Sequence, residues 1–205
     1  MDNFTYQKDE LNLELEKYEW DNVWWEQPCN HTKLRVLYIG DSISCPTRRI
    51  ATKLSGEEIL FDGLGTSKAV DNPYFAESIR LFSRQQKNRD IIILNNGLHG
   101  WHLSDSTEYK FHYEELVKFL MEEFKDTPLA LVLTTCVPGE RNERVIARNN
   151  SVKEIAQKYQ LPIIDLFSVS VENLHLQIQG DAHWTEEGYH KLAEKILAAV
   201  WEICR

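Results

Sequence analysis

The chain of 205 residues is long enough for one domain with a substantial core, and its 42% hydrophobic and 27% charged residues argue against disorder. Its formal net charge of −9, from 32 acidic and 23 basic residues, disfavours nucleic acid or an anionic membrane surface as a partner. An uncharged substrate or a small acyl compound suits the negative electrostatic field of this chain better than a polyanion does.

The N-terminal stretch up to Trp20 is acidic and is broken by charges every few residues. It lacks the basic start and apolar run of a signal peptide, and no stretch of the chain is long enough to span a bilayer. We therefore expect a cytoplasmic protein. We also predict that residues 1–33, which include Trp24 and Trp25, form a segment that packs on a single domain of residues 34–205.

Short apolar runs alternate with helical patterns along the rest of the chain. The runs are mostly continuously apolar, which is typical of strands covered on both faces. The predicted strands are 34–39, 58–61, 91–94, 129–134 and 162–166. The predicted helices are 73–84, 109–124, 144–159 and 185–204, the last with Thr185 as its N-cap. This alternation predicts a three-layer α/β/α sandwich with a central parallel five-stranded sheet.

The carboxyl edge of such a sheet is where ligands bind. Turn-forming and reactive residues gather at this predicted edge, in the stretches 40–42, 62–67, 95–102 and 180–184. Ser42 follows the first strand, and a serine in a Gly-Asp-Ser turn is often only a turn former. The Asp-His pair at 181 and 183, expected at the same edge, favours a nucleophilic serine, because a nucleophile needs a base.

From residue 34 to the C-terminus the sequence resembles the SGNH (GDSL-like) hydrolase family. The resemblance is carried by GDSIS at 40–44, by the glycine-rich turn at 62–67 and by DAHWTEEGYHKLA at 181–193. It implies a flavodoxin-like SGNH hydrolase fold and ester hydrolysis without a metal or an organic cofactor. It also implies that Ser42 is the nucleophile, that Asp181 and His183 complete a Ser-His-Asp arrangement, and that the backbone N–H groups of Ser42 and Gly65 form the oxyanion hole.

The third sequence block departs from the family pattern. The family usually reads Gly-x-Asn-Asp there, with the Asn side chain completing the oxyanion hole. Here Gly97 takes the position of that glycine, so His99 takes the position of the asparagine, and Asn95 and Asn96 lie just upstream. We expect Asn96 and His99 to contribute to the oxyanion hole.

Three more side chains are candidate substrate contacts, namely Asn95, Trp101 and Trp184. The two tryptophans flank the predicted site, where they could stack on a sugar ring or simply cover it. The charge-dense stretch 140–150 also lies at the functional edge. Its arginines Arg141 and Arg144 could touch substrate, although a solvated helix start is the favoured interpretation.

The spacing of the last block is shortened. The usual Asp-x-x-His becomes Asp181-Ala182-His183, which leaves two alternatives open. Either Asp181 reaches the imidazole by a different loop path, or the enzyme works as a Ser-His dyad with the ring oriented by another group. Neither the four scattered cysteines nor His99 and His102 have the partners that a metal site requires.

These residues predict a serine carboxylic-ester hydrolase that acts on a short acyl ester, such as an acetyl ester of a carbohydrate, with the oligomeric state left open. The first alternative is a non-catalytic domain of the same fold that binds a glycan or a partner protein. A second, weaker alternative is a flavodoxin-like domain that binds a small ligand or phosphate through its glycine turns. Neither alternative needs a paired nucleophile and base.

Overall fold

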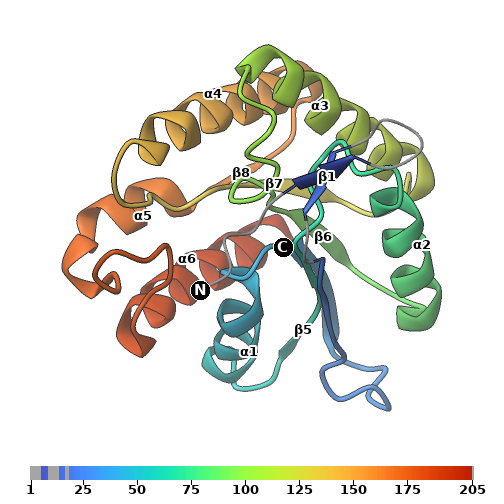
Figure 1. Ribbon diagram of the computed structural model, residues 1–205. Coiled ribbons are helices and arrows are strands. Elements are labelled where there is room, and N and C mark those ends of the chain that lie inside the picture. Colours follow the sequence, from blue (N-terminus) through green and yellow to red (C-terminus); the bar gives the residue numbers. More distant parts are fainter. Residues whose placement is uncertain (1–5, 9–13, 17–18, 205) are drawn as a thin grey trace.

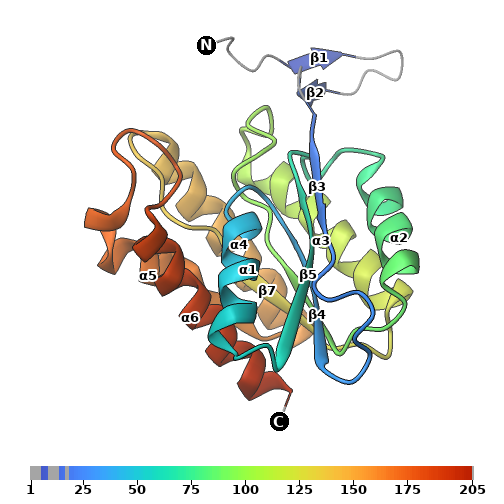
Figure 2. The ribbon, with the colours of Figure 1, turned by 90° about the horizontal axis from the view of Figure 1, so that it is seen from below.

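The computed structural model describes residues 6–8, 14–16 and 19–204. Its main feature is a six-stranded sheet with the strand order β3-β5-β4-β6-β7-β8, in which every neighbouring pair is parallel except β3 and β5. Strands β1 and β2 pair with each other in a separate two-stranded antiparallel sheet, beyond the end of β3 (Figure 2).

The strands are β1 (Tyr6–Lys8), β2 (Glu14–Glu16), β3 (Asp21–Trp24), β4 (Leu34–Gly40), β5 (Ile59–Thr66), β6 (Ile91–Leu94), β7 (Leu129–Leu133) and β8 (Ile163–Asp165). The helices are α1 (Ser44–Leu54), α2 (Phe75–Gln86), α3 (Ser106–Glu123), α4 (Arg141–Tyr159), α5 (Leu166–Glu172), the 3-10 helix η1 (Leu174–Leu176) and α6 (Glu186–Ile203).

Helices cover both faces of the main sheet (Figure 1). Helices α1, α5 and α6 pack with one face in one apolar cluster, and α2, α3 and most of α4 pack with the other face in a second. The central strands are apolar at nearly every position because both of their faces are buried. The predicted three-layer α/β/α sandwich is confirmed.

The five predicted strands are all present, but the sheet holds a sixth. Strand β3 runs antiparallel along the outer side of β5, so residues 21–24 of the N-terminal segment are built into the main sheet. Its side chains are exposed over most of its length, and it therefore lacks the apolar run by which the others were predicted. Beyond it, Trp25 stacks on Phe82 of α2 at a ring distance of 4.1 Å.

Strand β5 extends to Thr66, five residues past the predicted strand 58–61 and through most of the predicted turn 62–67. Glycines occupy two of these positions because helix α1 lies against them. A Cβ atom on Gly63 would lie 2.4 Å from Arg48 Cδ, and one on Gly65 would lie 2.4 Å from Cys45 Sγ. The glycine-rich stretch is thus a strand that lets a helix approach closely, not a turn.

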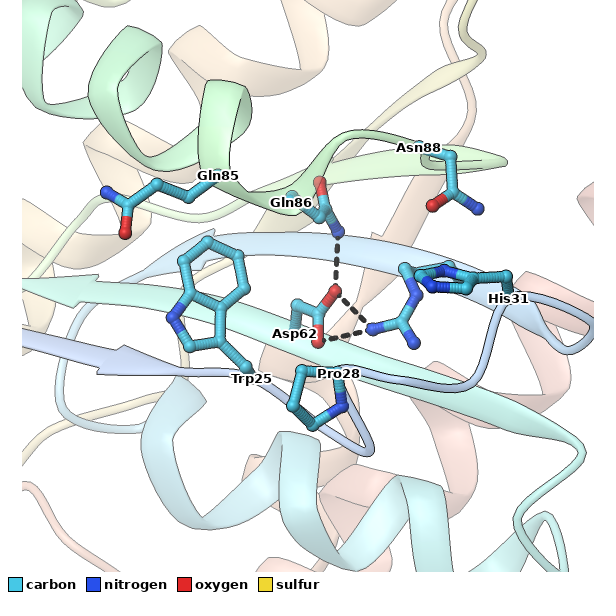
Figure 3. Close-up of a pocket in the computed structure, with 8 residues that line it drawn as sticks. Trp25, Pro28, His31, Asp62, Gln85, Gln86 and Asn88 are labelled. Carbon is cyan, nitrogen blue, oxygen red and sulfur yellow. Dashed lines mark hydrogen bonds and ion pairs between the residues drawn. The ribbon is translucent and has the colours of Figure 1, made fainter.

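Asp62, in the middle of β5, forms a buried ion pair with Arg35, the second residue of β4. Its carboxylate accepts from Arg35 Nη1 at 2.7 and 2.8 Å, from Gln86 Nε2 at 2.9 Å and from Glu26 N at 2.7 Å. Figure 3 shows Asp62 and Gln86 joined in this way at a cavity of about 200 Å³. Since both carboxylate oxygens of Asp62 and both terminal nitrogens of Arg35 are bonded internally, we assign this cavity a structural role.

Candidate active site

Ser42 lies directly after β4, at the carboxyl edge of the sheet. Strand β4 has β5 on one side and β6 on the other, so the chain leaves it where the strand order reverses, the usual ligand site of such sheets. The N–H of Ser42 makes no hydrogen bond to any described residue. It is therefore available to a bound ligand, as the oxyanion-hole prediction requires.

Asp41 shapes the turn that presents Ser42. Its Oδ1 accepts from Ile43 N at 3.0 Å, and its carbonyl accepts from Ser44 N at 3.1 Å and from Ser44 Oγ at 2.6 Å. The side chain is fully buried, and burial raises the pKa of its carboxyl, opposed by the nearby His99 and His183 rings. Asp41 is thus a structural residue of the turn.

His183 lies in a short loop between η1 and α6. Asp181 N donates to Ile178 O at 3.0 Å and Ile178 N donates to His183 O at 2.9 Å, which closes a tight turn. Gly180 takes the third position of that turn with φ +75°, a conformation that a side chain disfavours. Thr185 then caps α6 by accepting from Gly188 N, as predicted.

The three predicted catalytic side chains form one hydrogen-bonded chain. His183 Nε2 lies 2.9 Å from Ser42 Oγ, and His183 Nδ1 lies 2.7 Å from Asp181 Oδ1. An ionised carboxylate can only accept, so Nδ1 carries the ring proton, and Nε2 is left to accept from the Ser42 hydroxyl. This is the tautomer that a serine nucleophile needs in its base.

The shortened spacing between Asp181 and His183 is compatible with this chain. Asp181 Oδ1 also accepts from the backbone N of His183 at 3.2 Å, so one carboxylate holds both the backbone and the ring. Of the two alternatives left open by the sequence, the geometry favours the one in which Asp181 reaches the imidazole.

The hydrogen bond from the His183 ring lowers the pKa of the Asp181 carboxyl below its ordinary value. Asp181 therefore stays ionised at neutral pH and loses its charge only as the pH falls through this lowered pKa, below the ordinary range of an aspartate. The stability that the pair contributes is present above the ordinary pKa and is lost on that descent. Both side chains are about half exposed, at 49% and 41%, so water screens the pair and its main effect is to orient the ring.

The structure changes the prediction for Gly65. This residue lies inside β5, opposite Asn22 of β3, and two residues further on Ser67 donates its N–H to Trp20 O at 3.1 Å. N–H groups two residues apart in a strand point the same way, so the Gly65 N–H faces β3 and not Ser42. The unpredicted edge strand thus removes this amide from the oxyanion hole.

The two predicted asparagines are both buried and bonded. Asn95 Nδ2 donates to Val132 O at 3.1 Å and to Thr134 Oγ1 at 3.2 Å, which uses both of its N–H groups. Asn95 therefore has no side-chain N–H left to donate to a substrate. Asn96 Nδ2 donates to Lys68 O at 2.8 Å, which leaves one N–H on that nitrogen, so Asn96 stays a candidate donor.

His99 is half-buried in the loop after β6, and its ring meets Trp20 edge-on at 5.9 Å. Its charge would act on the buried Asp41 carboxyl, which lies beside Ser42. His99 therefore stays a candidate for the oxyanion hole. Nothing in the sequence indicated that Trp20 lies at this edge, because Trp20 directly precedes strand β3, which was not predicted.

Trp101 and Trp184 differ in their surroundings. Trp184 is buried in the core at 3% exposure, with its ring against Gly188 of α6, so it is a packing residue and not a substrate contact. Trp101 is half-buried and lines a cavity beside the His183 loop. Its ring has guanidinium groups at 4.8 to 5.5 Å from its centroid, which leaves little room for a sugar to stack there.

Sequence reasoning missed the role of Arg148. The stretch 140–150 was expected to be a solvated helix start, but Arg148 is 1% exposed. Its guanidinium donates to the carbonyls of Gly97, His99, Gly100 and Leu103. One buried cation thus holds the whole loop that carries His99 and Trp101.

Two further observations concern other chemistries. Burial raises the pKa of the Cys45 thiol, which keeps it protonated at neutral pH and makes it a poor nucleophile beside Ser42. Within residues 6–8, 14–16 and 19–204, no three His, Cys, Asp or Glu side chains are grouped so that they could hold a metal ion. None of the described helices is both long and apolar enough to cross a membrane.

Comparison with known proteins gives matches in structure but not in sequence. No family model and no curated protein matches the chain. The acetyl xylan esterase AlAXEase matches with a TM-score of 0.65 at 18% identity, over 82% of this chain and 100% of its own.

Two other solved structures show the same likeness. A member of the lipolytic G-D-S-L family from Veillonella parvula matches with a TM-score of 0.63 at 20% identity, over 80% of this chain and 97% of its own. The C-terminal catalytic domain of the Streptococcus pneumoniae peptidoglycan O-acetyltransferase OatA matches with a TM-score of 0.64 at 18% identity, over 83% and 94%. The fold is that of the SGNH (GDSL-like) hydrolases, which confirms the resemblance at the level of the fold.

Proposed function

We propose that this protein is a serine carboxylic-ester hydrolase that removes a short acyl group, such as acetyl, from a carbohydrate or another small ester. The observation that carries the proposal is the hydrogen-bonded chain from Ser42 Oγ through His183 to Asp181, with distances of 2.9 and 2.7 Å. It supplies a nucleophile, a base in the right tautomer and a carboxylate that orients the base.

The reaction would proceed through an acyl-enzyme. Ser42 Oγ attacks the ester carbonyl while His183 Nε2 takes its proton, and the negative charge on the carbonyl oxygen is met by the free N–H of Ser42. The bond to the alcohol then breaks, and the leaving oxygen takes the proton from His183. Water, deprotonated by the same ring, attacks the acyl-enzyme and releases the acid.

The substrate class rests on analogy and on access. An acetyl xylan esterase and the catalytic domain of a peptidoglycan O-acetyltransferase have the same fold, which supports an acetyl group on a carbohydrate. The half-exposed His183 and Asp181 side chains are open to a bulky alcohol.

Hydrolysis of 4-nitrophenyl esters tests the proposal. The wild type is expected to turn over the acetate faster than the butyrate and far faster than the octanoate. Replacing Ser42→Ala is expected to lower kcat by at least about 10³-fold, since removal of the nucleophile leaves only binding and oxyanion contacts. The control Ser78→Ala, a serine of helix α2, should match the wild type. Equal rates for wild type and Ser42→Ala would contradict the proposal.

One observation favours a second candidate, a non-catalytic domain that binds a glycan or a partner. The N–H of Gly65 faces β3 and both N–H groups of Asn95 are bonded, so two expected polar donors are absent from the site. A protein that binds acetylated sugars but hydrolyses neither them nor 4-nitrophenyl acetate would support this candidate.

A further inference from the structure

A cavity of about 150 Å³ adjoins the catalytic loop, and the proposed reaction leaves its occupant unassigned. Its wall brings together the loops after β6 and β7, the first residue of α4 and the His183 loop. The lining residues are Leu98, Trp101, Val137, Pro138, Arg141, Gly180 and Ala182. Gly180 and Ala182 belong to the loop that carries Asp181 and His183, so the cavity adjoins this loop, although neither catalytic side chain lines it. A cavity of this volume holds a group about the size of benzene, or roughly six non-hydrogen atoms.

Arg141 is the charged residue in this wall, and it is itself an exposed residue. Its guanidinium lies 5.3 Å from the Trp101 ring centroid and makes no hydrogen bond or ion pair with the described residues. The two other arginines beside Trp101 are committed, because Arg144 donates to Trp101 O and Arg148 donates to four loop carbonyls. Trp101 holds the Arg141 guanidinium in place by a cation–π contact.

The charges nearest the cavity are those of Arg141 in its wall and of the ionised Asp181, which lies between the lining residues Gly180 and Ala182 and is bonded to His183. The net charge of −9 disfavours an anion at long range, but the Debye length is about 8 Å at physiological ionic strength, so only nearby groups act strongly inside the cavity. Glu140 and Glu143 flank Arg141 in sequence but do not line the cavity. A planar guanidinium with free donors suits a carboxylate, which it can bind by two parallel hydrogen bonds.

We propose that Arg141 binds a carboxylate on the alcohol half of the substrate ester, and this inference rests on the proposed ester hydrolase. The alcohol half is chosen because His183 returns its proton to the leaving oxygen, which places the alcohol on the side of the His183 loop. The substrate class is thus a short acyl ester of a small acidic alcohol, such as a hydroxy acid or an acidic sugar.

Matched aryl acetates test the proposal. In 3-acetoxybenzoate and 3-acetoxybenzamide the leaving ring has the size of the cavity, and the two differ in one negative charge. The ratio of their kcat/KM values is expected to fall by about tenfold in Arg141→Gln, since a charge-assisted pair is lost, and to recover in part in Arg141→Lys. Comparing variants cancels the intrinsic reactivity of each ester. Arg84→Gln, at an exposed arginine of α2, is the control and should leave the ratio unchanged.

Two results would overturn the inference while leaving the proposed function in place. One is an unchanged ratio in Arg141→Gln in a protein that hydrolyses both esters. The other is an Arg141 dependence seen only when the charge is on the acyl half, as in 4-nitrophenyl hemisuccinate against 4-nitrophenyl butyrate. If the wild type hydrolyses neither these esters nor 4-nitrophenyl acetate, the ester hydrolase proposal itself fails and the role of Arg141 fails with it.

Discussion

Replacing His183→Ala is expected to lower kcat for 4-nitrophenyl acetate by about 10⁴-fold or more. The hydroxyl of Ser42 has its ordinary high pKa unless a base takes its proton, and His183 Nε2 at 2.9 Å is the base that the structure provides. Steady-state kinetics of the purified variant, corrected for the rate without enzyme, measures this loss. His175→Ala is a matched control, because His175 is exposed on η1 in the same loop region and should not affect turnover.

Replacing Asp181→Asn tests how much the carboxylate that orients His183 contributes to turnover. If Asp181 sets the tautomer of His183, the amide should lower kcat by about 10² to 10⁴-fold while the fold stays intact, because an amide can donate to Nδ1 and favour the wrong tautomer. A loss of less than about threefold would instead show that the protein works as a Ser-His dyad. Far-UV circular dichroism of each variant separates a catalytic effect from misfolding.

Replacing Asp62→Ala is expected to lower the free energy of unfolding by about 3–5 kcal/mol. Asp62 is fully buried and Arg35 is 3% exposed, so the substitution leaves a buried guanidinium without its partner. It also removes the acceptor for Glu26 N and Gln86 Nε2, which attach the N-terminal segment and helix α2 to the sheet. Urea denaturation followed by circular dichroism measures the change.

Two further variants test whether the loss of stability in Asp62→Ala comes from the unpaired buried charge of Arg35. The double variant Arg35→Met with Asp62→Leu should be less destabilised than Asp62→Ala, because no unpaired charge remains buried. Glu58→Ala breaks the Lys33–Glu58 pair, whose residues directly precede the same two strands, and should cost less than about 1 kcal/mol. Similar losses of unfolding free energy for Asp62→Ala and Glu58→Ala would show that the buried pair stabilises the fold no more than the exposed pair does.

The features that sequence predicted best are those with a local pattern. The continuous apolar runs located the five parallel strands, and the Gly-Asp-Ser turn after β4 placed Ser42 at the sheet edge. Asp181 and His183 were predicted because they lie two residues apart in one short loop at a predicted edge, and only His183 has to reach the distant Ser42.

The features that sequence missed depend on contacts between distant parts of the chain. Strand β3 has exposed side chains and exists because β5 offers it an unpaired edge, and this pairing in turn redirects the N–H of Gly65. Arg35 and Arg148 resemble ordinary surface arginines in sequence. The ion-pair partner of Arg35 is Asp62, 27 residues away, and the carbonyls that hold Arg148 are 45 to 51 residues away, which periodicity within one segment does not reveal.

The central claim is that Ser42 is an activated nucleophile, and labelling by a fluorophosphonate tests it most directly. Intact-mass and peptide mass spectrometry should find one adduct on Ser42 of the wild type, formed at least about a hundredfold faster than on His183→Ala, since the reaction needs the His183 base. An unmodified wild type, or adducts that form equally fast in His183→Ala, would contradict the account and favour a binding domain.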